Sequence, residues 1–206
     1  MMTITDITEI SKAKVKVCID HNETFALYKS ELRTYCINKD EEISGELYHK
    51  LMDEVLLKRA KLRCMNLLKS RDYTEYQLRT KLKQGLYPDS IIEDAVAYVI
   101  SFGYVNDIAY AKSYIAYAGN TRSRKQIETA LLGKGISKGD IAQAYEQCTE
   151  SESLACEEEI IRKLLVKKHY DGASAAYEER QKMIGFLYRK GFSLDKIYKA
   201  LGQTDF

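Results

Sequence analysis

The stretch TEYQLRTKLKQG, residues 74–85, reads as one helix with its own start and stop signals, and the chain repeats its pattern twice. Thr74 followed by Gln77 is a capping-box pattern, and Gly85 is typical of a helix end. The later copies are SRKQIETALLGKG (123–135) and AYEERQKMIGFLYRKG (176–191). Each copy has an apolar pair four residues apart, then basic residues and a glycine, but the first copy reaches its glycine one residue sooner. The pattern predicts one helical unit repeated in tandem.

The sequence around these copies predicts helices in groups of three. They are expected at 45–69, 75–84 and 88–102; at 107–118, 124–133 and 138–147; and at 152–168, 175–189 and 194–201. In the first helix, Ser44 is the expected cap, and one apolar stripe holds Leu47, Leu51, Val55, Leu62 and Met65. In the third helix, the expected core residues are Ile91, Ile92, Ala95, Val99 and Phe102. An isoleucine lies six residues after each repeat glycine, at Ile91, Ile141 and Ile197.

The N-terminal segment has a different periodicity. Residues 13–19, AKVKVCI, alternate strictly between apolar and polar positions, which is the period of a half-buried strand. Three antiparallel strands are predicted at 3–10, 13–19 and 23–29. The sequence therefore predicts a mainly α fold of three tandem, helix-turn-helix-like repeats in an elongated array, with a small antiparallel β segment. The expected domains are 1–43, 44–105, 106–148 and 149–206.

Composition and charge limit the classes of protein. The chain has 206 residues and a net charge of +2, but the segment from Lys58 to Arg71 holds six basic residues and no acidic one. Five dispersed cysteines without a CxxC motif favour reduced thiols in a cytoplasm. The N-terminus lacks the pattern of a signal peptide, and no apolar run approaches the roughly 20 residues that span a bilayer. A cytoplasmic protein without a membrane partner is expected.

The sequence offers no catalytic constellation. The three histidines are isolated, and the phosphate-binding, metalloprotease and nucleophile-elbow motifs are missing from the sequence. Three consecutive glutamates at 157–159 point in different directions on a helix and suit its first turn. We therefore expect no catalytic residue, no metal and no cofactor, and a protein that is not an enzyme.

Basic residues are the better functional candidates. Arg122, Arg124 and Lys125 cluster where a helix begins, which the helix dipole does not favour, so binding is the stronger interpretation there. Basic residues before the repeat glycines are explained equally well by the helix dipole. Tyrosines around Gly103 either stack on bases or, more commonly, pack between helices. The candidate binding residues are Lys58, Arg59, Arg63, Arg71, Arg79, Arg122, Arg124, Lys125 and Lys134.

A three-helix unit with a glycine-containing turn is also typical of helix-turn-helix proteins. One alternative is therefore a regulator that binds duplex DNA directly, with a preference for one site and usually a symmetric dimer. A scaffold that binds only protein is a further alternative. The sequence shows no dimerising helix, so a monomer is expected.

Four stretches together resemble the RecX family of recombinase regulators: 63–82, 101–115, 122–136 and 182–197. The family pattern includes a Gly–Tyr–(x)2–Asp turn, here Gly103, Tyr104 and Asp107, and a Leu-to-Lys–Gly–Ile step that ends at Ile136. The resemblance implies a non-enzymatic protein that lies in the groove of the RecA filament on single-stranded DNA and inhibits strand exchange and ATP hydrolysis. It also implies, for some members, direct binding to single- and double-stranded DNA. The shortened path to Gly85 departs from the pattern, so the first turn is expected to differ.

Overall fold

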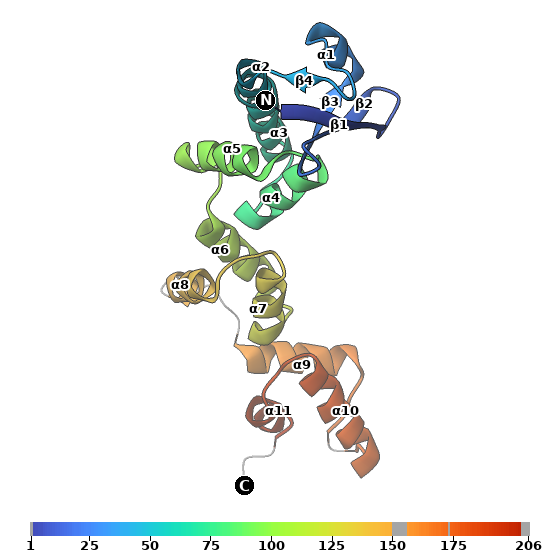
Figure 1. Cartoon of the computed structure of the whole chain (residues 1–206). Coiled ribbons are helices and arrows are strands. Elements are labelled where there is room, and N and C mark those ends of the chain that lie inside the picture. Colours follow the sequence, from blue (N-terminus) through green and yellow to red (C-terminus); the bar gives the residue numbers. More distant parts are fainter. Residues whose placement is uncertain (1, 150–155, 173, 203–206) are drawn as a thin grey trace. The chain divides into compact units, whose positions relative to one another are not determined.

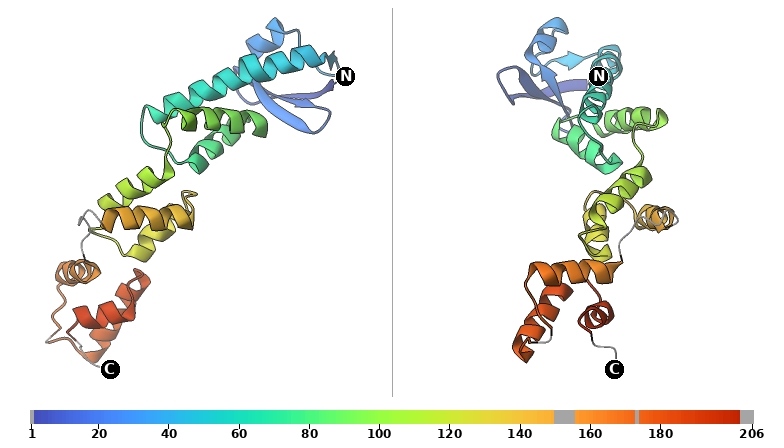
Figure 2. Two further views of the ribbon diagram at one scale, coloured as in Figure 1. Left: turned by 90° about the vertical axis from the view of Figure 1, so that its left-hand side faces the viewer. Right: turned by 180° about the vertical axis from the view of Figure 1, so that it is seen from behind.

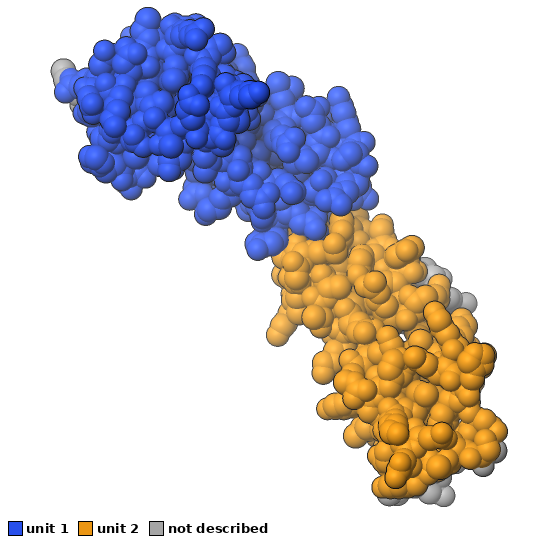
Figure 3. Space-filling model, turned by 90° about the vertical axis from the view of Figure 1, so that its right-hand side faces the viewer, with its two compact units in different colours: residues 1–106 blue, residues 107–206 orange. Residues whose placement is uncertain are grey.

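The computed structural model describes residues 2–149, 156–172 and 174–202. The chain divides into two compact units, Met1–Asn106 and Asp107–Phe206, which Figure 3 distinguishes by colour. As predicted, the fold is mainly helical with a small N-terminal antiparallel sheet (Figure 1). The predicted domain boundaries inside these units stay a prediction.

The sheet of the first unit contains β1 (Met2–Glu9), β2 (Lys14–Ile19), β3 (Glu23–Tyr28) and β4 (Glu42–Ile43), in the order β3-β2-β1-β4. All neighbouring strands are antiparallel. The three predicted strands are confirmed, and Val15, Val17 and Ile19 are buried as their alternation requires. The two-residue strand β4 and the short helix α1 (Lys29–Thr34) were not predicted.

The predicted long helix follows Ser44, whose side chain accepts a hydrogen bond from the Leu47 amide. It runs as α2 (Gly45–Lys50), a π-helical segment η1 (Leu51–Leu57) and α3 (Lys58–Leu68), and Figure 2 shows it as one rod with α4 (Glu75–Gln84) and α5 (Asp89–Ser101) beside it. The π-helical turns are wider than α-helical ones, so they displace the apolar stripe beyond them. Ala60 and Cys64 are therefore buried, whereas Leu62 is 63% exposed and its predicted core position is wrong.

The sheet and these helices share one hydrophobic core. Ile4, Val17 and Phe25 from the strands lie in the same cluster as Leu51 and Leu78 from the helices. The predicted core position of Phe102 is wrong, because this residue is the C-cap of α5 and is 58% exposed. Its ring stacks on the exposed Tyr104 and lies against Tyr98. Tyr98 also contacts a neighbouring helix, because Lys61 of α3 lies over its ring at 4.6 Å from the centroid.

The described residues of the second unit form six helices. They are α6 (Asp107–Ala118), α7 (Arg124–Leu132), α8 (Lys138–Thr149), α9 (Glu157–Lys167), α10 (Tyr177–Arg189) and α11 (Leu194–Ala200). Each matches a predicted helix, although residues 152–155 of the predicted 152–168 helix lie outside the described residues. The helices α6–α8 surround one core that includes Ile115 and Leu131, and α9–α11 surround another that includes Leu187 and Ile197.

The turn after the second helix of each triplet explains the odd spacing of the first repeat. Gly135 and Gly191 have left-handed backbone conformations, with φ of 85° and 84°. In the first repeat the left-handed residue is Leu86, with φ of 57°, and not Gly85, whose φ is −83°. Leu86 lies four residues after Leu82, the same step that separates Gly135 from Leu131. The first turn keeps the geometry of the others but places a leucine where they have glycine.

This correspondence also changes the expected match between the third helices. The amide of Ile92 donates to the carbonyl of Pro88, just as that of Ile141 donates to Ser137 and that of Ile197 to Ser193. Ile92, and not Ile91, is therefore the counterpart of Ile141 and Ile197. The predicted spacing of six residues counts from a glycine that does not hold the equivalent position.

The two triplets of the second unit are joined by polar contacts at the start of α7. The buried Ser123 hydroxyl accepts a hydrogen bond from the Gln126 amide and donates one to the carbonyl of Lys190, at 2.6 Å. The side chain of Glu157 accepts from the Arg124 amide at 2.7 Å and from Lys196 Nζ at 2.7 Å. The contacts of Ser123 with Lys190 and of Arg124 with Glu157 join α6–α8 to α9–α11, whereas the contact of Lys196 with Glu157 joins α11 to α9.

Gly191 is closely packed where the two triplets meet. The substitution Gly191→Ala is therefore expected to lower the free energy of unfolding by at least about 2 kcal/mol. A Cβ at Gly191 would lie 2.9 Å from Ser123 Oγ and 3.1 Å from Lys125 Cβ, in addition to the strain of a left-handed alanine. Gly103→Ala is the matched control, because Gly103 has φ of 71° and no atom within 4 Å of an added Cβ. It is expected to cost about 1 kcal/mol, from backbone strain alone. Equal losses in urea unfolding would contradict the close packing at Gly191.

Candidate functional site

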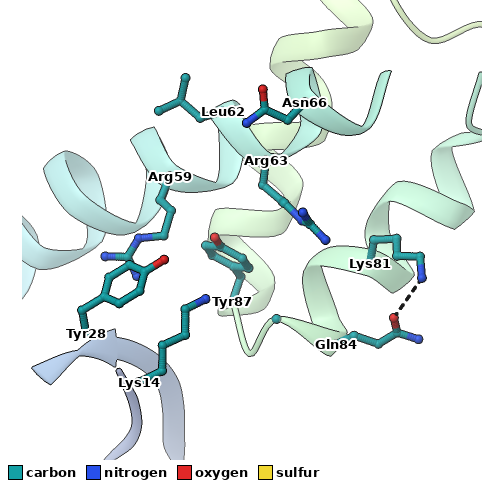
Figure 4. Close-up of a pocket in the computed structure, with 10 residues that line it drawn as sticks. Lys14, Tyr28, Arg59, Leu62, Arg63, Asn66, Lys81, Gln84 and Tyr87 are labelled. Carbon is teal, nitrogen blue, oxygen red and sulfur yellow. Dashed lines mark hydrogen bonds between the residues drawn. The ribbon is translucent and has the colours of Figure 1, made fainter. Parts of the chain in front are cut away.

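A recess of about 450 Å³ in the first unit brings two of the candidate basic residues, Arg59 and Arg63, together with two further cations. It lies where β2, β3, α3 and the end of α4 meet (Figure 4). Among the described residues its lining holds four cationic side chains and no carboxylate. The lining residues are Lys14, Tyr28, Arg59, Leu62, Arg63, Asn66, Lys81, Gln84, Gly85 and Tyr87.

Arg59 forms one wall of this recess but is committed to structural contacts. Its guanidinium pairs with Glu31 and donates to the carbonyl of Ala26 at 3.2 Å. It also lies over the ring of Tyr28, with Cζ 4.7 Å from the ring centroid. The side chains of Arg59 and Glu31 are only 19% and 21% exposed, so this pair fastens the helix α3 to β3 and α1. Of the nine candidates, Arg59 is thus largely occupied inside the fold.

The other cations of the recess have no ion-pair partner in the described part of the chain. Lys14 lies over the Tyr28 ring at 4.9 Å, and Lys81 donates to the Gln84 side chain at 3.4 Å. In Figure 4 the side chain of Lys14 points toward Tyr87, whereas that of Arg63 points toward the side of the recess where Lys81 lies. Burial raises the pKa of the Tyr87 phenol, against the opposing effect of nearby Arg59 and Arg63, so this hydroxyl stays protonated. The recess therefore presents three uncompensated positive charges beside neutral aromatic rings.

A second recess, also of about 450 Å³, lies within the second unit between the start of α7 and the end of α10. It is lined by Arg122, Lys125, Gln126, Thr129, Ala130, Tyr188, Arg189 and Gly191. Among the described residues, no carboxylate belongs to this lining. The joint through Ser123 and Gly191 thus brings together cations that are more than 60 residues apart in the sequence.

The predicted cluster Arg122, Arg124 and Lys125 is divided by the structure. Arg122 and Lys125 line the second recess, and Arg122 donates to the hydroxyl of Tyr114 at 2.8 Å. Arg124 points elsewhere: it pairs with Glu128 at 2.7 Å and lies over the Tyr145 ring at 4.4 Å. Its hydrogen bond to Glu128 raises the pKa of the guanidinium. The structure therefore replaces Arg124 with Arg189 in this group of cations.

The remaining candidates lie outside both recesses. Arg79 pairs with Glu75 and with Glu93, the latter at 2.8 Å, so its charge is balanced within the fold. Arg71 lies over the ring of Tyr73 at 4.6 Å, and Lys134 lies within 6 Å of the rings of Tyr110 and Tyr114. Lys58 is exposed on α3.

The candidate binding residues did not include Lys14, Lys81 or Arg189, which line these recesses. Lys14 belongs to a strand whose alternation explains it as a solvated residue, and Lys81 and Arg189 lie in the last turns of helices, where the dipole favours a cation. None of the three has a local signal for binding, because each joins its recess only through tertiary contacts.

Other classes of site find no support in the described residues. They hold no group of three or more histidine, cysteine or acidic side chains arranged to bind a metal. Within the same residues, none of the helices is long and apolar enough to cross a membrane. Burial raises the pKa of the Cys64 thiol to about 11, which keeps this cysteine protonated and unreactive at neutral pH.

Comparison with known proteins identifies the family. Residues 60–98 match the model of the first three-helix domain of RecX, and residues 157–201 match that of the third. The chain is 32% identical to the regulatory protein RecX of Caldanaerobacter subterraneus subsp. tengcongensis, over 98% of this chain and 100% of the relative. It is 26% identical to the regulatory protein RecX of Clostridioides difficile, over 96% and 94% of the two chains.

Two solved structures share the fold. A crystal structure of regulatory protein RecX superposes with a TM-score of 0.63 at 24% identity, covering 98% of this chain and 99% of the other. A crystal structure of RecX from Lactobacillus salivarius gives a TM-score of 0.59 at 23% identity, covering 71% and 95%. The extent and identity of the sequence match, together with the common fold, show that this chain belongs to the RecX family of regulatory proteins.

Proposed function

We propose that this protein binds the filament that RecA forms on single-stranded DNA, lies along its groove, and inhibits both recombinase and ATPase activity. It acts by binding, without a reaction of its own. The observation that supports this most directly is the pair of cationic recesses, each lined by at least three basic side chains and, among the described residues, by no carboxylate. Such surfaces suit a polymer that presents phosphates and carboxylates at regular intervals.

Membership of the RecX family supports the same proposal, because its members are named as regulatory proteins and its pattern implies RecA as the target. A regulator of a filament needs several separated contact surfaces more than it needs a pocket with catalytic groups. The two units provide one cationic recess each. A duplex-DNA regulator remains the competing function, and it requires preference for one base-pair sequence.

Co-sedimentation with RecA on single-stranded DNA, with ATP turnover followed in the same samples, tests the proposal. The protein is expected in the pellet only when RecA is assembled, and ATP hydrolysis is expected to fall as the protein is added. A sample without RecA separates filament binding from binding to DNA alone. Sedimentation without any change in ATP turnover would reject inhibition, and nanomolar preference for one duplex sequence would favour the competing function.

A further inference from the structure

The first recess is built jointly by the N-terminal sheet and the first helical triplet. Lys14 and Tyr28 come from β2 and β3, Arg63 and Asn66 from α3, and Lys81 from α4. The sheet is held in place by the common core, by the Arg59–Glu31 pair, and by the hydrogen bond from the Ala26 amide to the Leu86 carbonyl at 3.2 Å. The recess is therefore a fixed feature of the first unit, and the sheet supplies part of its chemistry.

The charges of the recess match more than one anionic group. Arg59 is compensated by Glu31, which leaves Lys14, Arg63 and Lys81 as positive charges around one hollow. A single carboxylate from a protein side chain would neutralise one of the three. A nucleic-acid strand carries one negative charge per nucleotide, roughly every 3.4 Å along one strand of a duplex, so neighbouring phosphates can meet several cations at once.

The other lining residues match the rest of a nucleotide. Tyr28 is 36% exposed and its ring contacts both Lys14 and Arg59, while Leu62, which lines the same recess, is 63% exposed. Asn66 and Gln84 carry amides that both donate and accept hydrogen bonds. Cations combined with accessible rings are the composition of sites for single strands, whose bases are free to contact aromatic and apolar side chains.

We propose that this recess binds the phosphodiester backbone of single-stranded nucleic acid, with Lys14, Arg63 and Lys81 contacting phosphates and Tyr28 contacting a base or sugar. The N-terminal sheet thereby becomes part of the binding site. This inference deepens the proposed function by naming the DNA strand as the partner of the first recess, and its test leaves RecA out.

The test measures binding of the full chain to fluorescein-labelled oligo(dT) by fluorescence anisotropy at several salt concentrations. The variant Lys14→Ala/Arg63→Ala/Lys81→Ala is expected to bind at least tenfold more weakly, with a salt dependence whose slope is smaller by about 2, because about 0.7 of a counterion is released per phosphate contact. The control is Lys12→Ala/Lys16→Ala/Lys50→Ala, which removes the same charge from the first unit outside the recess. It is expected to bind within threefold of the unmodified protein.

Single substitutions isolate the contribution of the sheet. Lys14→Ala is expected to reduce the slope by about 0.7, whereas Lys16→Ala, two residues along the same strand and outside the recess, is expected to leave it unchanged. Circular dichroism confirms that each variant is folded. Equal effects of Lys14→Ala and Lys16→Ala would show that charge alone matters and would overturn the role of the sheet.

Three results separate this inference from the proposed function. Loss of oligo(dT) binding in the triple variant supports the inference, whether or not RecA is inhibited. If the unmodified protein ignores oligo(dT) but the triple variant sediments less with RecA filaments, the recess binds protein carboxylates and the inference is overturned. Tighter binding to a duplex of equal length, with the same loss in the triple variant, would overturn the assignment to single strands.

Discussion

Arg59→Ala is expected to destabilise the first unit by about 2–3 kcal/mol, although it removes only one of several ion pairs at the surface of that unit. The substitution leaves the Glu31 carboxylate, 21% exposed, without its cation and leaves the Ala26 carbonyl without the guanidinium donor. It also removes the cation that lies over Tyr28. Urea unfolding of the full chain, with hydrogen exchange of the sheet amides, measures the loss and shows where it occurs.

Arg79→Ala is the control for this prediction, because Arg79 has two carboxylate partners where Arg59 has one. The pairs of Arg79 are more exposed, with 32% for Arg79, 41% for Glu75 and 63% for Glu93, so water replaces them at little cost. A loss below about 1 kcal/mol is expected. If Arg79→Ala lowered the free energy of unfolding as much as Arg59→Ala does, the burial of the Arg59–Glu31 pair would not explain its contribution to stability.

The same two arginines show why the sequence predicts helices better than it predicts a binding surface. Periodicity and capping residues are local signals, so they predicted the helical triplets and the three longer strands. Whether an arginine is accessible depends on which carboxylates the fold brings near it. Glu31 is 28 residues from Arg59, so no local pattern indicates that this arginine is paired. For Arg79, the spacing of four residues to Glu75 is a local signal of a helical ion pair, but the second partner, Glu93, is 14 residues away.

The errors in the predicted core have similarly specific causes. The wide turns of the π-helical segment move Leu62 out of the apolar stripe that begins at Leu47, and an α-helical period cannot anticipate that change. The left-handed conformation of Leu86 is equally hard to predict from the sequence. A leucine gives no signal for this conformation, and the neighbouring Gly85 suggests the wrong position. The shortened first repeat suggested that this turn is arranged differently, but its left-handed residue holds the same position as in the other two turns, and only the residue type there differs.

The second recess leads to the functional prediction with the largest expected effect, which follows from the contacts of its cations. Arg122, Lys125 and Arg189 line one hollow without a carboxylate in the described lining, whereas Arg124 is held by Glu128. The variant Arg122→Ala/Lys125→Ala/Arg189→Ala is therefore expected to raise the dissociation constant for RecA filaments by about 100-fold, from the loss of roughly 1 kcal/mol for each charge-assisted contact. Co-sedimentation with RecA on single-stranded DNA measures this change, and ATP turnover is expected to return toward its uninhibited rate.

Two further variants make this result specific to the recess. Arg162→Ala/Lys163→Ala/Lys167→Ala removes the same charge from exposed positions of α9 outside the recess and is expected to bind filaments within threefold of the unmodified protein. Arg124→Ala removes the one arginine of the predicted cluster that the fold holds in structural contacts, and it leaves Arg122 and Lys125 in place. Its expected effect is on the free energy of unfolding rather than on filament binding. Full inhibition by the recess variant would exclude this surface from the filament interface. An equal loss of binding in the α9 variant would instead show that binding depends on net charge. Both variants remove three positive charges from the same unit, and only the recess variant alters the hollow between α7 and α10.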